Sequence, residues 1–400
     1  MAVEATDAEQ ETSLPEENQE VDPQITLCHK IFKLSNPALC KDAAALGEEV
    51  KQAVLDRGMV ALYPGYCEKF GWMLDDSAMA AMKAKNAEAV KALDEKIKDA
   101  EDNLGDSELR EAMLAKAEFF VQVGDRVAAV AAFDACEKKT VAIGQKMEMV
   151  FSVMRLHIFH SDWGALKTAV ARLKHFLEQP GGADWERKNK LKVYEGVLLM
   201  ACRDFAGATV LFLESLSTFT TYELMTYPEF IFYAVVCAVV SLKRTDLKDK
   251  VIDSPEVLSV VDQLPGVGAL VNALHQCKYR EFMTAFPAVG DQVIASAWLA
   301  QHHRYFLREA RVAAYAQFLQ SYKSVTTASM AAAFAVSEEF LDAELSNFIV
   351  NGRLNAKIDK VNGVLVTNRP DTKNALYQSY IKEGDHLLNR IQKLSRVIDL

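Results

Sequence analysis

The sequence of 400 residues lacks the short motifs that mark common catalytic centres. Its seven cysteines are scattered and include no Cys-x-x-Cys pair, which argues against a zinc cage or a dithiol redox centre. It has no His-x-His pair of a metalloprotease and no phosphate-binding Gly-x4-Gly-Lys-Ser/Thr loop. Gly266-Val267-Gly268 lacks the third glycine of a dinucleotide fingerprint. We therefore predict no enzymatic activity, no cofactor and no metal.

The sequence also lacks a secretion signal and a long apolar run. Its N-terminus is acidic and polar, without a basic stretch followed by an apolar one. The longest largely apolar run, Ile231 to Leu242, is shorter than the ~20 residues of a membrane-spanning helix and predicts a buried helix. Dispersed cysteines are typical of reduced thiols. We expect a cytoplasmic and nuclear protein with no membrane partner.

Basic residues are absent from residues 1–23, which carry eight of the acidic residues. Such an acidic segment buries too little apolar surface to offset the entropy lost on ordering, so we predict a disordered tail over 1–23. The chain carries a net charge of −10, so the remaining residues have a net charge of only −2. A nearly neutral body does not favour general binding to nucleic acid.

A long helix is predicted from Met79 to Leu104, within a helical N-terminal region spanning 24–105. Apolar or small residues recur there every three or four positions, and Gly105 follows as a candidate left-handed cap. The stripe is short and Asn86 interrupts it. We therefore favour a helix docked along a larger helical body over a free coiled-coil dimer.

Four aspartates recur in similar turns, at Asp125, Asp162, Asp204 and Asp246, with intervals of 37, 42 and 42 residues. This spacing fits one two-helix unit per repeat and predicts a helical solenoid over 106–300. The period is too irregular for a strict tetratricopeptide array. The fold class is therefore mostly α, with a right-handed, tetratricopeptide-like solenoid.

A winged helix is predicted next, within 301–371. A helical stripe from Tyr305 to Tyr322 precedes a short helix over 326–334 and a turn at Ala335-Val336-Ser337. Ser337 is a candidate N-cap for a helix that ends at Gly352. Alternating residues then predict strands over 354–358 and 364–367, joined by the hairpin signal Asn362-Gly363.

A final helix is predicted over 372–400. Its apolar residues form a wide stripe that would stay exposed unless the helix packs on other helices. Docking onto the repeats of the same chain is one possibility, but its position after a complete module favours a bundle with other chains.

The order of solenoid, winged helix and terminal helix resembles the PCI family, named for the proteasome lid, the COP9 signalosome and translation initiation factor 3. Specific stretches are similar to proteasome-lid members of this family over residues 60–400; they are 116–119, 184–189, 217–224, 352–354, 357–362, 367–371 and 387–398. The resemblance implies a structural lid subunit in a hetero-oligomer, supporting degradation of ubiquitinated proteins. Implied partners are other PCI-domain lid subunits, the deubiquitinating metalloprotease subunit and the ATPase ring.

Two groups of histidines have simple structural interpretations. His157 and His160 share a helix face near Asp162, a spacing that also arises wherever a helix ends in a polar turn. His302 and His303 are adjacent and point in different directions on a helix, which makes joint metal ligation awkward.

Because winged helices can bind nucleic acid, the charges on the predicted winged helix and on the solenoid matter. The would-be recognition helix carries Glu338, Glu339, Asp342 and Glu344 without any Lys or Arg, so it would repel phosphates unless some acids face away. A basic cluster beside Trp185 offers either a partner contact or a solvated face; its members are Arg187, Lys188, Lys190 and Lys192.

The leading hypothesis is a lid scaffold whose wing extends the sheet of a neighbour and whose terminal helix joins a bundle. Two alternatives stay open, a signalosome scaffold subunit of the same architecture and a winged-helix nucleic-acid-binding protein. The candidate interface residues are Leu354, Ile358, Val364, Val366, Ile381, Leu387, Leu388, Ile391, Leu394, Val397 and Ile398.

Overall fold

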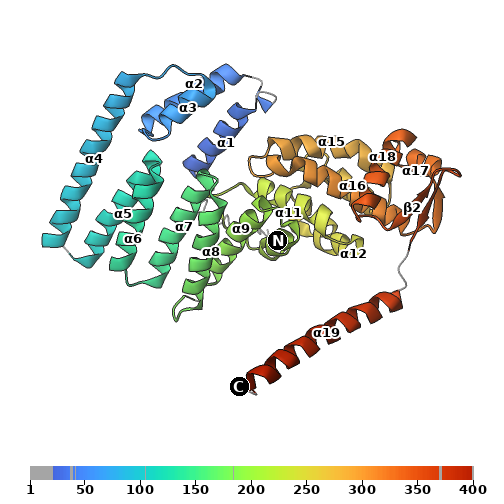
Figure 1. Cartoon of the computed structure of the whole chain (residues 1–400). Coiled ribbons are helices and arrows are strands. Elements are labelled where there is room, and N and C mark those ends of the chain that lie inside the picture. The colour runs from blue at the N-terminus through green and yellow to red at the C-terminus, as the bar shows by residue number, and fades with distance from the viewer. Residues whose placement is uncertain are drawn as a thin grey trace, which may run out of the picture. The chain divides into compact units, whose positions relative to one another are not determined.

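The computed structural model describes residues 21–36, 39–40, 42–103, 105–182, 184–368 and 372–398. These residues form two compact units. The first contains the chain up to His275 together with Ala285–Leu307, and the second contains Gln276–Thr284 together with the chain from Arg308 onward. Most described residues are helical, and three strands form one small sheet (Figure 1). The mostly helical fold class is confirmed.

The disordered tail was predicted over residues 1–23, but residues 21–23 are ordered. Residues 1–20 lie outside the described part of the chain. Asp22 caps helix α1 (Pro23–Ser35) by accepting a hydrogen bond from the Gln24 amide at 2.8 Å. Its own amide donates to the Glu223 carbonyl at 2.8 Å, and its carboxylate lies 3.2 Å from the Arg155 guanidinium. The composition of a short segment could not show these distant partners.

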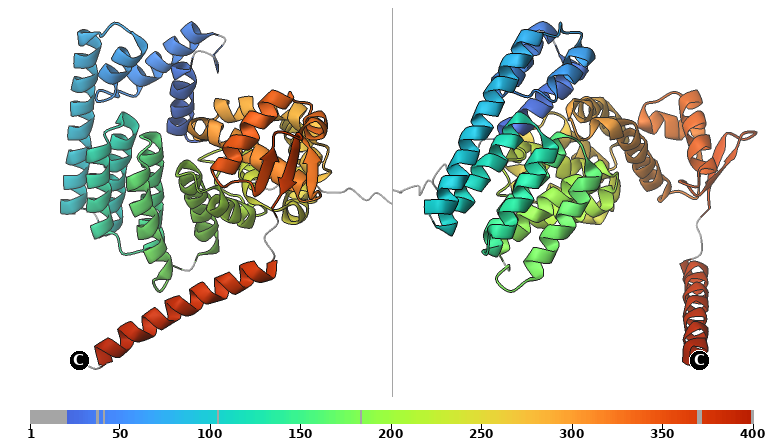
Figure 2. Two further views of the ribbon diagram at one scale, coloured as in Figure 1. Left: turned by 45° about the vertical axis from the view of Figure 1, so that its right-hand side comes forward. Right: turned by 60° about the vertical axis from the view of Figure 1, so that its left-hand side comes forward.

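Helices α2 (Ala43–Asp56), α3 (Tyr63–Phe70) and α4 (Asp76–Asn103) complete the N-terminal region. Their apolar faces share a core with α1. Helix α4 packs along its neighbour α5, as expected for a docked helix (Figure 2). Asn86, which interrupts its apolar stripe, donates its side-chain amide to the Gly58 carbonyl at 2.8 Å. Gly58 has a positive φ of 65°, and a Cβ there would lie 2.7 Å from the Asn86 amide oxygen.

Three antiparallel helix pairs follow and stack on one another (Figures 1 and 2). They are α5 (Asp106–Val123) with α6 (Arg126–Lys139), α7 (Ile143–Phe159) with α8 (Trp163–Glu178), and α9 (Trp185–Ala201) with α10 (Phe205–Ser215). Each pair buries small and aromatic side chains, for example Ala117 and Phe133 between α5 and α6. The predicted helical repeat is thus present.

The turn inside each of these pairs has the same construction. A residue with positive φ comes first: Gly124, Ser161 or Arg203. An aspartate then caps the second helix, its carboxylate accepting the amide three residues on. The three hydrogen bonds are Asp125 to Ala128 at 3.1 Å, Asp162 to Ala165 at 2.9 Å and Asp204 to Gly207 at 3.0 Å. These three predicted turns are confirmed.

The fourth predicted turn, at Asp246, is wrong. Asp246 lies inside the four-residue helix α12 (Arg244–Leu247), and Lys243 occupies the N-cap position instead. Irregular segments follow: a π-helical turn η2 (Lys248–Ile252), α13 (Pro255–Leu258) and the 3₁₀ turn η3 (Val261–Gln263), before α14 (Val267–His275). Residues with positive φ precede the next two helices, Gly266 ahead of α14 and Cys277 ahead of α15 (Tyr279–Ala295), but neither is followed by an aspartate.

Helix α11 (Tyr227–Ser241) contains the longest apolar run and is buried as predicted. A capping box between Thr226 and Glu229 begins it, and its buried residues run without interruption from Phe230 to Val239. Among the described helices, none combines the length and the apolar character needed to cross a membrane.

A short connection, η4 (Ala300–His302), leads from α15 to α16 (His303–Leu319). His302 is buried against the α9–α10 turn: its Nε2 lies 2.8 Å from the Ala201 carbonyl, and Arg203 Nε donates to its Nδ1 at 3.3 Å. This is the local packing role expected for His302.

The predicted winged helix is present. Thr326 caps α17 (Thr327–Phe334), and Ser337 caps α18 (Glu338–Val350), its hydroxyl accepting the Phe340 amide at 3.4 Å. The module core contains Met330, Phe334, Leu341, Leu345, Phe348 and Leu365.

The sheet of this module differs from the expected two-stranded wing. A third strand, β1 (Ser324–Thr326), was not predicted, and the strand order is β1-β3-β2. β3 (Val364–Thr367) is therefore the central strand, antiparallel to β1 and to β2 (Ala356–Asp359). A strand of three residues gives too little alternation to be read from sequence.

The final helix, α19, spans Thr372–Ile398, in agreement with the predicted terminal helix (Figure 1).

Candidate interaction surfaces

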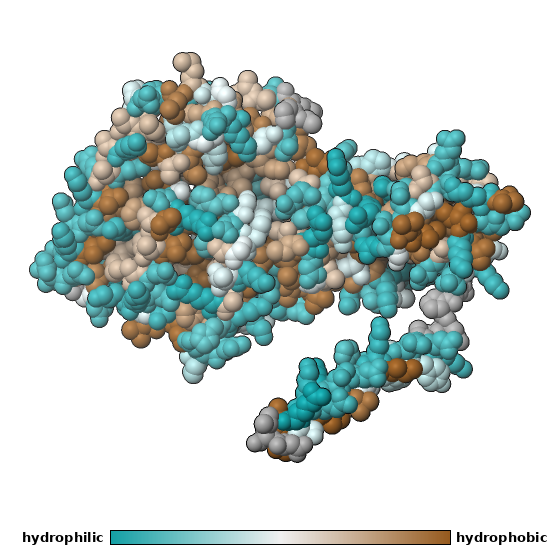
Figure 3. All heavy atoms as spheres, viewed as in Figure 1, coloured by the Kyte–Doolittle hydropathy of each residue, from teal (hydrophilic) through white to brown (hydrophobic). Residues whose placement is uncertain are grey.

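Helix α19 presents its apolar side chains to solvent. The exposed fractions of these side chains run from 52% at Ile391 to 72% at Ile398. Figure 3 shows brown, apolar atoms along one side of the helix and teal, polar atoms along the other. The apolar set is Leu376, Tyr377, Tyr380, Ile381, Leu387, Leu388, Ile391, Leu394, Val397 and Ile398. It includes all seven of the interface residues predicted on this helix.

The apolar residues of α19 follow a seven-residue repeat. Steps of four and three connect the seam Tyr377, Ile381, Gly384, Leu388, Ile391, Ser395 and Ile398. Tyr380, Leu387 and Leu394 widen this seam on one side at intervals of seven. Three apolar positions per heptad are typical of a helix that packs against more than one neighbour, whereas two are typical of a dimeric coiled coil. The pattern therefore favours a helical bundle.

The wing offers less apolar surface than the sequence predicted. Leu354 is only 5% exposed and packs inside its own module, so its side chain is not available to a partner. Ile358 and Val364 are half-buried, and Val366 is 41% exposed. The expectation of free backbone groups on Val364 and Val366 is wrong, because β3 pairs on both sides. Among the described strands, the outer edges belong to β1 and β2.

The acidic residues of α18 divide into two groups. Glu344 lies 2.7 Å from Arg311 and accepts a hydrogen bond from the Tyr315 hydroxyl at 3.0 Å, and Asp342 pairs with Lys360 at 3.0 Å. Glu338 and Glu339 are exposed at the start of the helix. These two acids, beside the exposed Phe340, disfavour a phosphate backbone and suit contact with protein.

The basic cluster beside Trp185 is largely used within the chain. Arg187 Nε lies 2.9 Å from Glu148, and Lys192 lies 3.0 Å from Glu214. Lys190 lies 3.1 Å from Glu223. Cations that already have carboxylate partners offer little to RNA or to an acidic neighbour. These three side chains are therefore largely covered and paired within the chain, which fits neither a partner contact nor a solvated face.

An ionic cluster in the solenoid escaped prediction because its members are far apart in sequence. Arg155 lies 2.7 Å from Glu223 and 3.2 Å from Asp22, and the Tyr194 hydroxyl donates to Glu223. Burial alone would raise the pKa of Glu223, but Arg155 and Lys190 outweigh it and hold the pKa below its usual value. The cluster joins the start of α1 to α7 and α9, a structural role.

The histidines near Asp162 lie in a similar structural setting. Burial, followed by the charge of Arg126, lowers the pKa of both His157 and His160. The Asp162 carboxylate already accepts the Ala165 amide and pairs with Arg126. No group of three metal-ligating side chains is found within the described ranges of the chain.

Three segments of the chain match models of known protein families. Residues 75–250 match the 26S proteasome subunit RPN7 model, residues 288–369 match the PCI domain, and residues 377–398 match the 26S proteasome regulatory subunit RPN7/PSMD6 C-terminal helix. The exposed face of α19 thus falls in a segment that has a family model of its own.

Curated relatives extend this likeness to most of the chain. The 26S proteasome non-ATPase regulatory subunit 6 homolog of Arabidopsis thaliana is 48% identical over 379 residues, which is 94% of this chain and 97% of that protein. The subunit 6 of Dictyostelium discoideum is 43% identical, over 86% of this chain and 89% of that protein. The regulatory subunit RPN7 of Saccharomyces cerevisiae is 38% identical, over 79% and 74%. These matches do not favour the signalosome alternative, and the chain belongs to the family of the 26S proteasome non-ATPase regulatory subunit 6.

Proposed function

We propose that this proteasome regulatory subunit is a non-catalytic scaffold of the lid, which holds its neighbours through α19 and the winged helix. Its relatives are named as regulatory and non-ATPase subunits, and the chain is part of a multi-subunit complex. The role proposed here is mechanical: it positions other subunits so that the assembled proteasome degrades ubiquitinated proteins in an ATP-dependent manner.

The observation that carries this proposal is the exposed apolar face of α19. Burying one large apolar side chain contributes about 1.5–3 kcal/mol, so ten such side chains represent a large unused free energy of association. Soluble chains seldom leave such a continuous face in water. A bundle with helices of neighbouring subunits uses the whole face at once.

The winged helix supplies a second, smaller contact. The outer edge of β2 offers backbone donors and acceptors for another strand, with Ile358 half-buried beside it. The exposed Phe340 at the start of α18 and Val366 on the central strand add apolar contact area. We propose that this module aligns one neighbouring PCI-domain subunit while α19 anchors the assembly.

The proposed partners are other PCI-domain lid subunits, the deubiquitinating metalloprotease subunit and the ATPase ring. We further propose a cytoplasmic and nuclear location, since the scattered cysteines form no disulfide in the described part of the chain.

Deletion of residues 372–400 tests the proposal. The shortened chain should keep its helical circular dichroism and its unfolding midpoint, because the described residues of α19 bury no side chain in the fold. Its occupancy in affinity-purified lid, measured by quantitative mass spectrometry, should fall at least tenfold. Normal occupancy would contradict the anchoring role of α19.

The same purification distinguishes the remaining alternatives. Co-purified proteasome subunits support the proposal, whereas signalosome subunits would contradict it. For the nucleic-acid alternative, anisotropy of labelled duplex DNA with the full chain should show no salt-sensitive binding, because no basic side chain lies on α18.

A further inference from the structure

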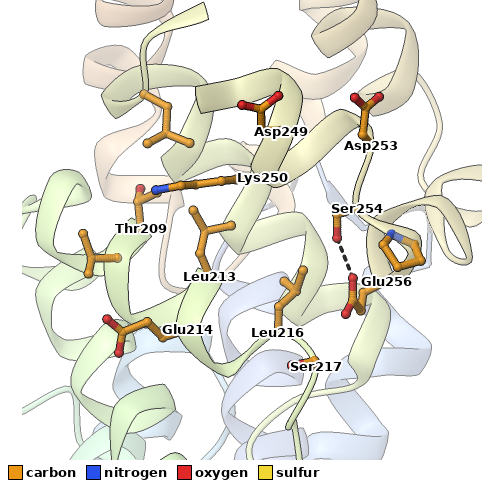
Figure 4. A pocket seen from close by; sticks show the side chains of 13 residues that line it. Thr209, Leu213, Glu214, Leu216, Ser217, Asp249, Lys250, Asp253, Ser254 and Glu256 are labelled. Carbon is orange, nitrogen blue, oxygen red and sulfur yellow. Dashed lines mark hydrogen bonds between the residues drawn. The ribbon is translucent and has the colours of Figure 1, made fainter. Parts of the chain in front are cut away.

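The break in the helical repeat leaves a hollow on the surface of the first unit. After α11, the short α12, the π-turn η2 and α13 stand where the regular pairs would continue. These short elements cover α10 incompletely, and a cleft of about 470 Å³ lies between them (Figure 4). Its size falls in the range of pockets that hold a peptide side chain or a small molecule.

The floor of this cleft is apolar and comes mainly from α10. Leu213 and Leu216 project into it in Figure 4, and Leu242 and Pro255 add to the lining. Val210, on the same helix, is 55% exposed. In a regular repeat, the next helix would cover these side chains.

The rim of the cleft is acidic. Four carboxylates and one ammonium, that of Lys250, are among its described lining residues, and one of the four, Glu214, is already paired with Lys192 at 3.0 Å. Figure 4 shows Leu213 and Leu216 between Glu214 on one side and Glu256 on the other, while Lys250 extends toward Thr209. The Ser254 hydroxyl donates to Glu256 at 2.7 Å and lowers the pKa of this carboxyl group, which therefore stays ionised at neutral pH.

Two further carboxylates lie on the π-turn side of the cleft. Asp249 makes no ion pair with the described residues, and Asp253 is 3.9 Å from Lys248, a weak surface contact. A π-helical turn is rare in proteins and often occurs at functional positions. In Figure 4 both acids lie on the far side of Lys250 from Leu213 and Leu216, so the cleft has an apolar floor and, at its π-turn end, an anionic edge.

From this combination we infer that the cleft binds a segment of another polypeptide in which a bulky aliphatic residue stands next to lysine or arginine. The aliphatic side chain enters between Leu213 and Leu216, and the cation meets Asp249 and Asp253. The site is built from residues of the solenoid and uses none of α19 or of the wing. This inference is therefore independent of the proposed scaffold contacts, and either of the two proposals can be wrong while the other holds.

The test uses the full chain and three fluorescein-labelled peptides measured by fluorescence anisotropy. The sequences are Gly-Arg-Leu-Lys-Leu-Gly, the acidic counterpart with Glu in place of Arg and Lys, and the polar counterpart with Ser in place of Leu. Only the first should bind, and raising the salt from 0.15 M to 0.5 M should weaken it. The double variant Asp249→Asn with Asp253→Asn should weaken binding about five- to tenfold, and Leu213→Ser should weaken it further.

A matched control removes two exposed acids elsewhere, Glu88→Gln with Glu95→Gln on α4, and should leave binding unchanged. The inference is overturned if the basic peptide does not bind at 1 mM, if the acidic or polar peptide binds equally well, or if the rim variant binds like the control. Analytical ultracentrifugation of the chain without peptide tests whether a second copy of the chain occupies the cleft instead. Self-association that is lost in Leu213→Ser would assign the cleft to a second copy and reject the inference.

Discussion

Helix α11 has 12 apolar residues among its 15 and α19 has 11 among its 27, and the two helices have opposite environments in the structure. In α11, every residue from Phe230 to Val239 is buried, and apolar side chains surround the helix. In α19, apolar side chains occupy one face, polar ones the other, and all are exposed where the structure describes them. The first helix stabilises the fold of the chain, whereas the second is available for assembly.

The difference shows that the fraction of apolar residues and their distribution around a helix, and not their absolute number, separate the two roles. A helix that is apolar all round needs a complete shell within its own chain. A helix with one apolar face can remain soluble until partners cover that face. Variants in the two helices should therefore change different measurements.

The largest expected effect on stability is in α11. Phe230 is fully buried, with its ring stacked on Phe219 at 4.6 Å and edge-on to Phe212 at 5.5 Å. Phe230→Ala should lower the free energy of unfolding by about 3–5 kcal/mol in urea titration, because it leaves a cavity that the neighbours fill poorly.

The matched change in α19, Ile391→Ala, should alter the free energy of unfolding of the isolated chain by no more than about 0.5 kcal/mol. A loss of unfolding free energy comparable to that of Phe230→Ala would contradict the distinction between the two helices, since it would mean that α19 packs within the chain.

The ionic cluster of the solenoid should give the next largest effect. Glu223→Gln removes the charge that faces Arg155 and Lys190, and should lower the free energy of unfolding by about 2 kcal/mol at pH 7. Because the folded pKa of Glu223 lies below its usual value of 4.5, the stabilisation is present above that pH and is lost as the pH falls below it. Thermal unfolding from pH 7 to pH 3 should show wild type and variant converging; parallel curves would contradict the assignment.

The turn aspartates give a smaller effect with an internal control. Asp125→Ala, Asp162→Ala and Asp204→Ala should each lower the free energy of unfolding by about 1 kcal/mol, since each removes a helix cap. Asp246→Ala should change it by less than about 0.5 kcal/mol, because Asp246 caps no helix. Equal losses of unfolding free energy at all four positions would show that Asp246 also caps a helix, and would contradict this assignment.

The smallest effect concerns His302. Burial, only partly offset by the Ala201 carbonyl, lowers its pKa below 6.5, so the neutral ring is the stable form in the folded chain. Protonation of the unfolded chain below pH 6.5 should then reduce stability slightly. The variant His302→Gln should show a smaller drop in unfolding midpoint between pH 7.5 and pH 5.5 than wild type, and an unchanged drop would rule out this contribution.

Local signals explain which parts of the fold could be predicted. Ser337 and the three turn aspartates cap helices through hydrogen bonds to residues only three positions away, so sequence spacing alone reveals them. The hairpin at Asn362-Gly363 is equally local. The terminal helix was found because its apolar repeat extends over its whole length.

Contacts between distant segments explain what could not be predicted. The ordering of Asp22 depends on Arg155 and Glu223, which no spacing rule connects to it. The central position of β3 depends on β1, which is only three residues long. Aspartate identity suggested a turn at Asp246, but this kind of turn also has a left-handed residue before the aspartate, as at Gly124, Ser161 and Arg203, and Thr245 does not have a positive φ.

The central claim is that the apolar face of α19 holds the chain in its assembly. It is tested most directly by lid occupancy of Ile391→Glu and Asn389→Glu, two substitutions that add the same charge about 200° apart around the helix. Occupancy is measured by quantitative mass spectrometry of affinity-purified lid. The account predicts that Ile391→Glu lowers occupancy at least tenfold while Asn389→Glu matches wild type. Equal occupancy of the two variants would contradict it.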